Sequence, residues 1–213
     1  MECCQSFMLD NGAFTAWKQG QPIADWSEYY QWAIHCSHHP GFDFAVIPDV
    51  IDGSEKDNDD LIAQWRSVVY HADIGAPVWH MHESLDRLNN LCRNWRCICL
   101  GSSGEYATLQ TDRWWERMSE AMSIVCDKQG RPKVKLHGLR MLDPAVFSVL
   151  PLSSADSTNA VRNGSSISRF GMYVSPNLTT RMAVIADRIE AHNSAAVYRF
   201  ERQRTRWLLK MDA

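Results

Sequence analysis

The stretch that decides the fold is residues 133–157, KVKLHGLRMLDPAVFSVLPLSSADS. It begins with alternating polar and apolar residues, which predict a strand, and Gly138 then opens a turn. Asp143 followed by Pro144 predicts a helix start, because aspartate caps free backbone N–H groups and proline fits the first helical turn. A second strand is predicted after this helix, and it places Asp156 at its carboxyl end. The order of strand, helix and strand is typical of neighbouring strands in a parallel sheet.

The same order of elements recurs in the preceding sequence. Apolar runs predict buried strands, which lie at residues 6–9, 42–50, 76–82, 97–100, 133–137 and 152–156. Apolar residues at helical spacing predict helices between them, at residues 26–38, 59–71, 84–95 and 112–127. A seventh strand is expected at residues 170–174, and one or two helices at residues 177–211. We therefore predict an α/β fold.

The predicted architecture is a TIM-barrel-like (β/α) barrel, either complete or in an incomplete or modified form. The sequence shows no second domain boundary, so we predict one domain over residues 1–213. Its barrel core would occupy about residues 6–175, followed by a basic helical segment at about residues 177–211. In such barrels the chemistry takes place at the carboxyl ends of the strands.

The composition is that of an ordinary globular protein, with 45% hydrophobic and 22% charged residues and a net charge of −3. No run of about 18 apolar residues occurs, so we expect no membrane span. The N-terminal residues lack the basic and apolar regions of a signal peptide. We therefore expect the seven cysteines to be reduced thiols in a cytoplasmic compartment, which is the bacterial host cytoplasm if a phage encodes the chain.

Charge is unevenly distributed along the sequence. Residues 160–213 hold 9 Lys/Arg against 4 Asp/Glu, whereas the first 159 residues hold 13 against 21. A basic tail of this kind could contact nucleic-acid phosphates, and the alternative is a solvated amphipathic helix with arginines on its outer face.

Polar or glycine residues follow each of the predicted strands. They are Asp10, Asp49, His80, His82, the 101–105 segment, His137, Gly138 and Asp156. Two carboxylates at one site suit double displacement at a sugar carbon, where one attacks and the other handles a proton. The alternative for Asp10 and Asp49 is a role as turn formers or helix caps.

His80 and His82 flank Met81 at a predicted strand end. Because side chains alternate across a strand, we expect only one of the two histidines to face the site. Cys97 and Cys99 lie in a buried strand and lack the spacing of a zinc site, so we predict no metal and no other cofactor.

Several of these segments, in this order, resemble the tRNA-guanine transglycosylase family and its short phage and bacterial relatives, which are thought to place 7-deazaguanines in DNA. The segment LDNGAF at 9–14 is similar to the family's Asp-Ser-Gly-Gly/Ala-Phe segment, and LGSSGE at 100–105 resembles its Gly-Leu-Ala-x-Gly-Glu loop. The segment KLHGL at 135–139 resembles the one before the nucleophile strand. SADST at 154–158 carries an aspartate at the place of the nucleophile, and RNG at 162–164 is similar to the family's Arg-x-Gly.

The resemblance implies a role for each matching residue. Asp156 would be the nucleophile and Asp10 the general acid/base, while Asp49 would bind the guanine edge. The other predicted base contacts are His80 or His82, Gly101, Ser102, Gly104, His137 and Gly138. The predicted phosphate contacts are Arg162, Arg199, Arg202, Arg204 and Arg206, by their charge.

The chain also departs from the tRNA enzymes. The Cys-x-Cys-x-x-Cys zinc site is absent from the sequence, the chain is much shorter, and His80-Met81-His82 stands where those enzymes have a glutamine. We therefore predict DNA as the nucleic-acid partner and a base such as 7-cyano-7-deazaguanine as the second substrate. Three alternatives stay open: exchange in tRNA, an N-glycosidase that releases base without an acceptor, and a non-catalytic nucleic-acid-binding relative.

Overall fold

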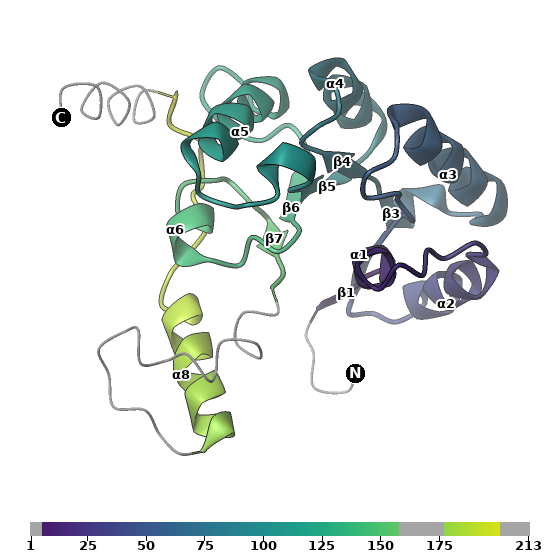
Figure 1. Ribbon diagram of the computed structural model, residues 1–213, viewed down its shortest axis with the longest axis horizontal. Helices are drawn as coiled ribbons and strands as arrows, with labels where there is room; N and C mark the ends of the chain where they lie inside the picture. Colours follow the sequence, from purple (N-terminus) through teal and green to yellow (C-terminus); the bar gives the residue numbers. More distant parts are fainter. Residues whose placement is uncertain (1–5, 158–176, 201–213) are drawn as a thin grey trace. The chain divides into compact units, whose positions relative to one another are not determined.

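A computed structural model describes residues 6–157 and 177–200 of the protein (Figure 1). The chain separates into two compact units, Met1–Thr108 and Leu109–Ala213, called here the N-terminal and C-terminal units. The single domain expected over residues 1–213 stays a prediction.

The N-terminal unit contains five parallel strands and the helices that connect them. Its strands are β1 (Phe7–Leu9), β2 (Phe42–Val46), β3 (Gly75–Ala76), β4 (Val78–His80) and β5 (Cys97–Gly101). A three-stranded sheet has the order β1-β2-β3, and β4 pairs with β5. The helices are α1 (Ala13–Lys18), α2 (Ser27–Ser37), α3 (Glu55–Val68) and α4 (Leu85–Asn94), with 3-10 turns η1 (Ala72–Ile74) and η2 (Gly104–Tyr106).

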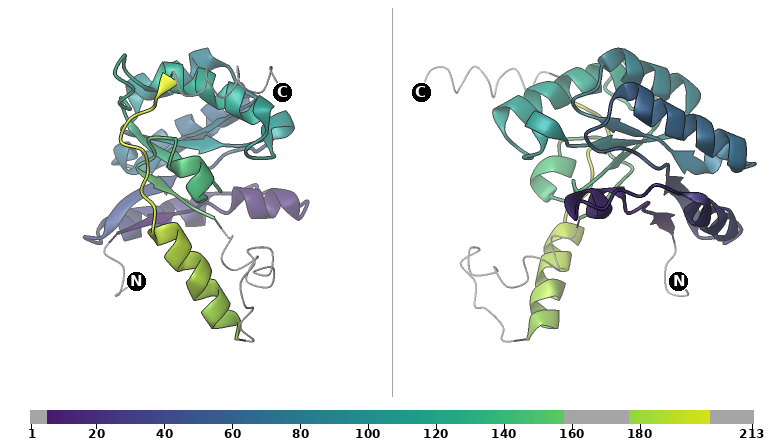
Figure 2. Two further views of the ribbon diagram at one scale, coloured as in Figure 1. Left: turned by 90° about the vertical axis from the view of Figure 1, so that its left-hand side faces the viewer. Right: turned by 45° about the vertical axis from the view of Figure 1, so that its right-hand side comes forward.

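The C-terminal unit contains α5 (Asp112–Val125), β6 (Lys135–Gly138), α6 (Pro144–Phe147), β7 (Ser154–Ala155) and α8 (Leu178–Glu190). Strands β6 and β7 are parallel, with His137 opposite Ser154. Helix α6 lies within the connection that joins these two strands (Figure 2). The stretch that decided the fold thus folds as strand, short helix and strand, and the α/β class with parallel strands is confirmed.

The predicted strand at residues 76–82 is wrong in two respects. Pro77 splits it into β3 and β4, because proline has no N–H to donate to a neighbouring strand. The two halves also face different partners, since β3 pairs with β2 and β4 pairs with β5. The strand then ends at His80 instead of residue 82.

The start of α3 was predicted at residue 59 and lies four residues earlier, at Glu55. The Ser54 side chain accepts a hydrogen bond from the Asp57 N–H, and the Asp57 carboxylate accepts one from the Ser54 N–H, which together form a capping box. Helix α1 was not predicted, because it is only six residues long. The strand expected at residues 170–174 lies outside the described residues.

Large apolar side chains fill the interior of each unit. In the N-terminal unit, Trp65 is fully buried, its ring lies edge-on to Tyr30, and its Nε1–H donates to the Ala72 carbonyl at 3.0 Å. Gly75 makes this possible, because a Cβ there would lie 2.7 Å from Trp65 Nε1. In the C-terminal unit, α5 buries Trp114 and other apolar residues along one face. This burial supplies the main driving force for each unit's fold.

Candidate functional site

Three strands of the N-terminal unit end in polar residues that contact one another. Asn11 follows β1, Asp49 follows β2, and His80 ends β4. The strands are parallel, so their carboxyl ends lie along the same edge of the strands. The fold therefore brings Asn11 into contact with Ile47 and Asp49, which lie 36 and 38 positions further along the chain.

Asp49 is held between an amide and an imidazole. Asn11 Nδ2–H donates to Asp49 Oδ1 at 2.8 Å and to the Ile47 carbonyl at 3.0 Å. His80 Nε2 lies 2.9 Å from Asp49 Oδ2, with both side chains almost fully buried. The N-cap of α3 is Ser54 and not Asp49, so the helix-cap alternative is wrong for Asp49. Its carboxylate instead has a fixed direction.

A buried hydrogen-bond network centred on Glu83 holds the backbone of His80. Glu83 Oε2 accepts from the His80 N–H at 2.9 Å and from Arg87 Nη1–H at 2.7 Å, while Oε1 accepts from Asn58 Nδ2–H at 2.9 Å. Arg87 also donates to the Val78 carbonyl at 3.0 Å. The Glu83 side chain is fully buried, so these donors replace all of its contact with water.

Replacing Arg87 by leucine is expected to destabilise the protein by about 3–5 kcal/mol, because Glu83 would stay buried without its cation. Urea unfolding followed by tryptophan fluorescence measures this difference. Arg93→Leu on the same helix is the matched control, since Arg93 is exposed and should change stability by only about 0.5 kcal/mol. Equal effects of the two variants would contradict a structural role for the buried ion pair.

The expectation that only one of His80 and His82 faces the site stays a prediction, but the reason given for it does not hold, because residues two apart share a face of a strand. His82 lies beyond the end of β4, and its ring stacks on that of His80 with centroids 5.6 Å apart and planes 20° from parallel. His82 is exposed and joins two loops, with Nδ1 2.8 Å from Ser103 Oγ and Nε2 3.1 Å from the Gly53 carbonyl. His80 instead holds Asp49, so the two rings have different partners.

The glycine-rich loop lies against these histidines. A Cβ at Gly101 would lie 3.1 Å from His80 Nδ1, so glycine leaves room for the buried ring. Gly104 has a positive φ of 55° and lies beside His82, because a Cβ there would be 3.8 Å from His82 Cβ. Ser102 is half-buried in the same loop. The predicted loop residues therefore stand next to the predicted histidines within one unit.

Asp10 is exposed at the end of β1, unlike its neighbour Asn11. Tyr29 lies close to it, and burial followed by the negative charge of Asp10 raises the pKa of the Tyr29 hydroxyl far above its usual range. Tyr29 therefore stays protonated and donates to the Val46 carbonyl at 2.7 Å. This bond fixes the end of β2, from which Asp49 projects.

In the C-terminal unit, Asp156 lies just beyond β7, and its carboxylate contacts two groups within the part of the chain that the structure describes. Its Oδ1 accepts a hydrogen bond from the Arg140 N–H at 2.6 Å and lies 3.6 Å from His137 Nε2. The Asp156 side chain is 42% exposed, whereas that of His137 is 1% exposed. His137 Nδ1 lies 2.9 Å from Ser154 Oγ. The predicted nucleophile is thus accessible to solvent but fixed in direction by the protein.

Gly138 serves packing at the end of β6. A Cβ there would lie 2.8 Å from both Leu152 Cδ1 and Met141 Cβ, so a larger residue would displace the core. The Gly138 carbonyl accepts from the Asp156 N–H at 3.2 Å. Gly138 thereby ties the two strand ends together, and its predicted base contact stays a prediction.

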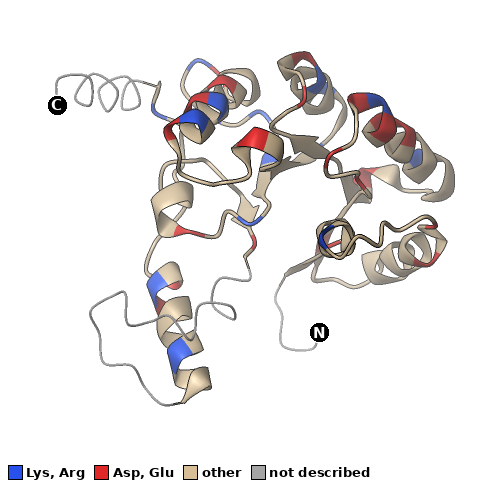
Figure 3. Ribbon diagram, in the orientation of Figure 1, with Lys and Arg blue, Asp and Glu red and all other residues tan. Residues whose placement is uncertain are grey.

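The predicted phosphate contacts fall largely beyond the described structure. Arg162, Arg202, Arg204 and Arg206 lie outside the described residues, and Arg199 is exposed. Figure 3 shows blue segments along α8, which carries Arg181 and Arg188. A role in phosphate binding stays a prediction for all five residues.

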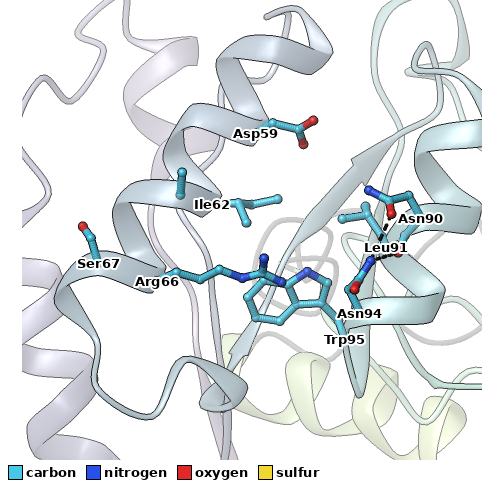
Figure 4. Close-up of a pocket in the computed structure, with 9 residues that line it drawn as sticks. Asp59, Ile62, Arg66, Ser67, Asn90, Leu91, Asn94 and Trp95 are labelled. Carbon is cyan, nitrogen blue, oxygen red and sulfur yellow. Dashed lines mark hydrogen bonds between the residues drawn. The ribbon is translucent and has the colours of Figure 1, made fainter.

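A separate groove lies between α3 and α4 in the N-terminal unit, with a volume of about 500 Å³ (Figure 4). The Arg66 guanidinium covers the Trp95 ring at 4.7 Å from its centroid. The remaining lining residues include Asp59 and Asn90, and none of the predicted site residues contributes to it. The groove is therefore distinct from the strand-end cluster around Asp49.

Within residues 6–157 and 177–200, no group of three or more His, Cys, Asp or Glu side chains has an arrangement that could hold a metal ion. In the same residues, the cysteines carry free thiols, at Cys36, Cys92, Cys97, Cys99 and Cys126. No helix in this part of the chain has the length and apolar character needed to span a bilayer.

Comparisons with models of protein families, with curated proteins and with solved structures found no match to this chain. The transglycosylase resemblance therefore remains a hypothesis based on the sequence segments.

Sequence reasoning did not assign a site role to Asn11, Glu83 or Arg87. Asn11 could have been suspected because it lies two residues after the end of β1, next to Asp10, which the sequence analysis did select. Glu83 and Arg87 carry a weaker signal, namely an acid and a base four residues apart at a helix start, which usually indicates a surface pair. Nothing in the sequence indicated that this pair would be buried.

Proposed function

We propose that the protein is a pentosyltransferase that exchanges guanine in DNA for a 7-deazaguanine base through a covalent Asp156–glycosyl intermediate. The observation that carries the proposal is the state of the Asp156 carboxylate, which is accessible yet held by the Arg140 N–H at 2.6 Å. A carboxylate that attacks a sugar carbon needs both properties, because it must reach the substrate in one fixed orientation. Its sequence context, SADST, agrees with the resemblance.

The proposed reaction proceeds by two displacements. An Asp156 oxygen forms a bond to C1′ of an extruded deoxyguanosine, and the C1′–N9 bond breaks with its electron pair going to guanine. Asp10 supplies a proton to the departing base. The incoming 7-deazaguanine then loses its N9 proton to Asp10, and N9 displaces the Asp156 carboxylate from C1′.

Base recognition is assigned to the strand-end cluster of the N-terminal unit. Asn11 and His80 fix the direction of the Asp49 carboxylate. A fixed carboxylate can accept hydrogen bonds from the N1–H and amino group of guanine, which a 7-deazaguanine presents in the same way. The adjacent Gly101 to Gly104 loop would contact the base through its backbone.

The fold and family belong to the same proposal. We propose that the parallel strands are parts of a TIM-barrel-like (β/α) barrel and that the chain is a short member of the tRNA-guanine transglycosylase family, acting in the cytoplasm. The lack of a Cys-x-Cys-x-x-Cys segment favours DNA over tRNA as the substrate. Arg162, Arg199, Arg202, Arg204 and Arg206 are the proposed phosphate contacts.

Radiolabelled guanine tests the proposal directly. The purified protein should incorporate label into duplex or single-stranded DNA, and unlabelled 7-cyano-7-deazaguanine should then displace it. Incorporation into tRNA alone would identify a tRNA enzyme instead. Release of guanine from DNA without an added base would identify an N-glycosidase, and binding of DNA without exchange would identify a non-catalytic relative. Each of these three results would overturn the proposal.

A further inference from the structure

We propose that His137 is a positioning residue, which together with the Arg140 N–H holds Oδ1 of Asp156 and presents Oδ2 for attack. This inference rests on the function proposed above, and it adds that the two carboxylate oxygens have different roles. It replaces the base contact expected for His137 from the sequence.

The geometry of the carboxylate gives the first reason. Among the described residues, the side-chain contacts of Asp156 end on Oδ1, with the Arg140 N at 2.6 Å and His137 Nε2 at 3.6 Å. Arg140 has a positive φ of 61°, which turns its N–H toward the carboxylate in the loop after β6. One donor, the Arg140 N–H, and one neighbouring ring, that of His137, thus lie at the same carboxylate oxygen and leave Oδ2 to face away from them.

The burial of His137 gives the second reason. Its side chain is 1% exposed, and its two ring nitrogens face Ser154 and Asp156. A base would have to displace one of these two residues to reach the ring. A role through Asp156 requires no such change, because the ring already borders the carboxylate.

Ser154 can set the tautomer of the His137 ring. If the Ser154 hydroxyl donates to Nδ1, the proton of the neutral ring lies on Nε2 and points toward Asp156 Oδ1. The separation of 3.6 Å exceeds a hydrogen bond, so in the free enzyme the ring acts on the carboxylate through its dipole. Contacts of this kind often shorten when substrate binds.

The same arrangement occurs in the N-terminal unit. Asp49 follows a strand, and the buried His80 directs its Nε2 at one carboxylate oxygen from 2.9 Å. Both aspartates therefore have a buried histidine whose Nε2 faces them. The pairs His80–Asp49 and His137–Asp156 belong to different units, so the chain uses the same type of contact twice to orient an aspartate near a strand end.

In the proposed step, Oδ2 of Asp156 forms the bond to C1′ and the C1′–N9 electron pair leaves with guanine. Oδ1 becomes the carbonyl oxygen of the glycosyl ester and still accepts the Arg140 N–H. The negative charge thus moves from the carboxylate to the departing base, which is protonated by Asp10. His137 neither gains nor loses a proton in this step.

Kinetics of two variants test the inference. His137→Ala should lower kcat for labelled-guanine exchange about 10- to 100-fold while KM for the base changes less than about 2-fold. His137→Gln should restore part of the loss, because its side-chain N–H can reach toward Oδ1. Mass spectrometry of the acid-quenched enzyme should show a smaller glycosyl-enzyme fraction for the alanine variant in the first turnover.

A second pair of variants covers the case in which His137→Ala fails to fold. Ser154→Ala removes the hydroxyl at Nδ1 without opening a large cavity, and should also lower kcat with KM unchanged. Ser153→Ala is the matched control, because Ser153 is exposed and contacts neither residue through its side chain. A rise in KM without loss of kcat would indicate a base contact and overturn the inference.

Two further results would also overturn it: wild-type kinetics for the His137 variants, or equal effects of Ser154→Ala and Ser153→Ala. The test is separable from that of the proposed function. Failure of the wild-type protein to exchange guanine at all would remove the proposed function, whereas exchange that requires Asp156 but is insensitive to His137 and Ser154 would remove only this inference.

Discussion

Asparagine in place of Asp156 is expected to lower kcat for base exchange on the order of 10⁴-fold or more, because an amide oxygen is too weak a nucleophile to displace guanine. The fold should be retained, since the asparagine Oδ1 can still accept the Arg140 N–H. Exchange of labelled guanine in DNA measures the loss. Mass spectrometry of the denatured protein should show the glycosyl adduct on the wild type and not on the variant.

Asp143→Asn is the matched control in the same unit. Asp143 caps α6 by accepting the Ala145 N–H at 2.9 Å, and asparagine caps a helix about equally well. Its exchange rate should therefore stay near that of the wild type. An Asp156→Asn variant that exchanges guanine at the control's rate, or that still forms the adduct, would show that the nucleophile is another group.

Asparagine in place of Asp49 is expected to lower kcat/KM for the incoming base by about 100-fold or more, because its amide N–H groups would face the donors of the guanine edge. The substitution also disturbs the protein, since the new N–H groups meet His80 Nε2, which lies 2.9 Å from Asp49 Oδ2. We therefore expect a loss of about 1–3 kcal/mol in the free energy of unfolding as well.

Two measurements separate the effects of this Asp49 substitution. Equilibrium binding of labelled 7-cyano-7-deazaguanine reports the base contact, and urea unfolding reports the stability. Asp52→Asn is the control, because Asp52 is exposed on the same loop and should change neither quantity by more than about 2-fold or 0.5 kcal/mol. Unaltered base affinity in a folded Asp49 variant would restrict this residue to a structural role.

The class of fold was predictable because strands such as β4 and β5 lie in apolar runs and the longer helices α3, α4 and α5 each have an apolar side. The bounds of individual strands and helices were harder to predict, because they depend on single residues such as a proline or a helix cap. Pro77 interrupts a run that is otherwise typical of one strand, and only the pairing of β3 with β2 and β4 with β5 reveals the exchange of partners. The capping box at Ser54 lies in a polar segment without helical apolar spacing, so the true start of α3 was missed.

The candidate site was predictable only as a set of positions at strand ends. Asp49 and Asp156 could be singled out because acids there are not needed for a sheet. Their partners could not, since the contact between Asn11 and Asp49 depends on the register of strands separated by more than thirty residues. The argument about His80 and His82 misapplied the two-residue period of a strand, since residues two apart lie on the same face, and the two rings in fact stack.

The change of partners at Pro77 has a mechanical consequence. The Ala76 carbonyl accepts from the Ile47 N–H at 2.9 Å, and the Pro77 carbonyl accepts from the Cys99 N–H at 2.9 Å. Adjacent peptide groups therefore lock the chain to β2 on one flank and to β5 on the other. Deleting a single residue here would move β4 by one position relative to β3, and would place the Met81 side chain instead of the His80 imidazole beside Asp49.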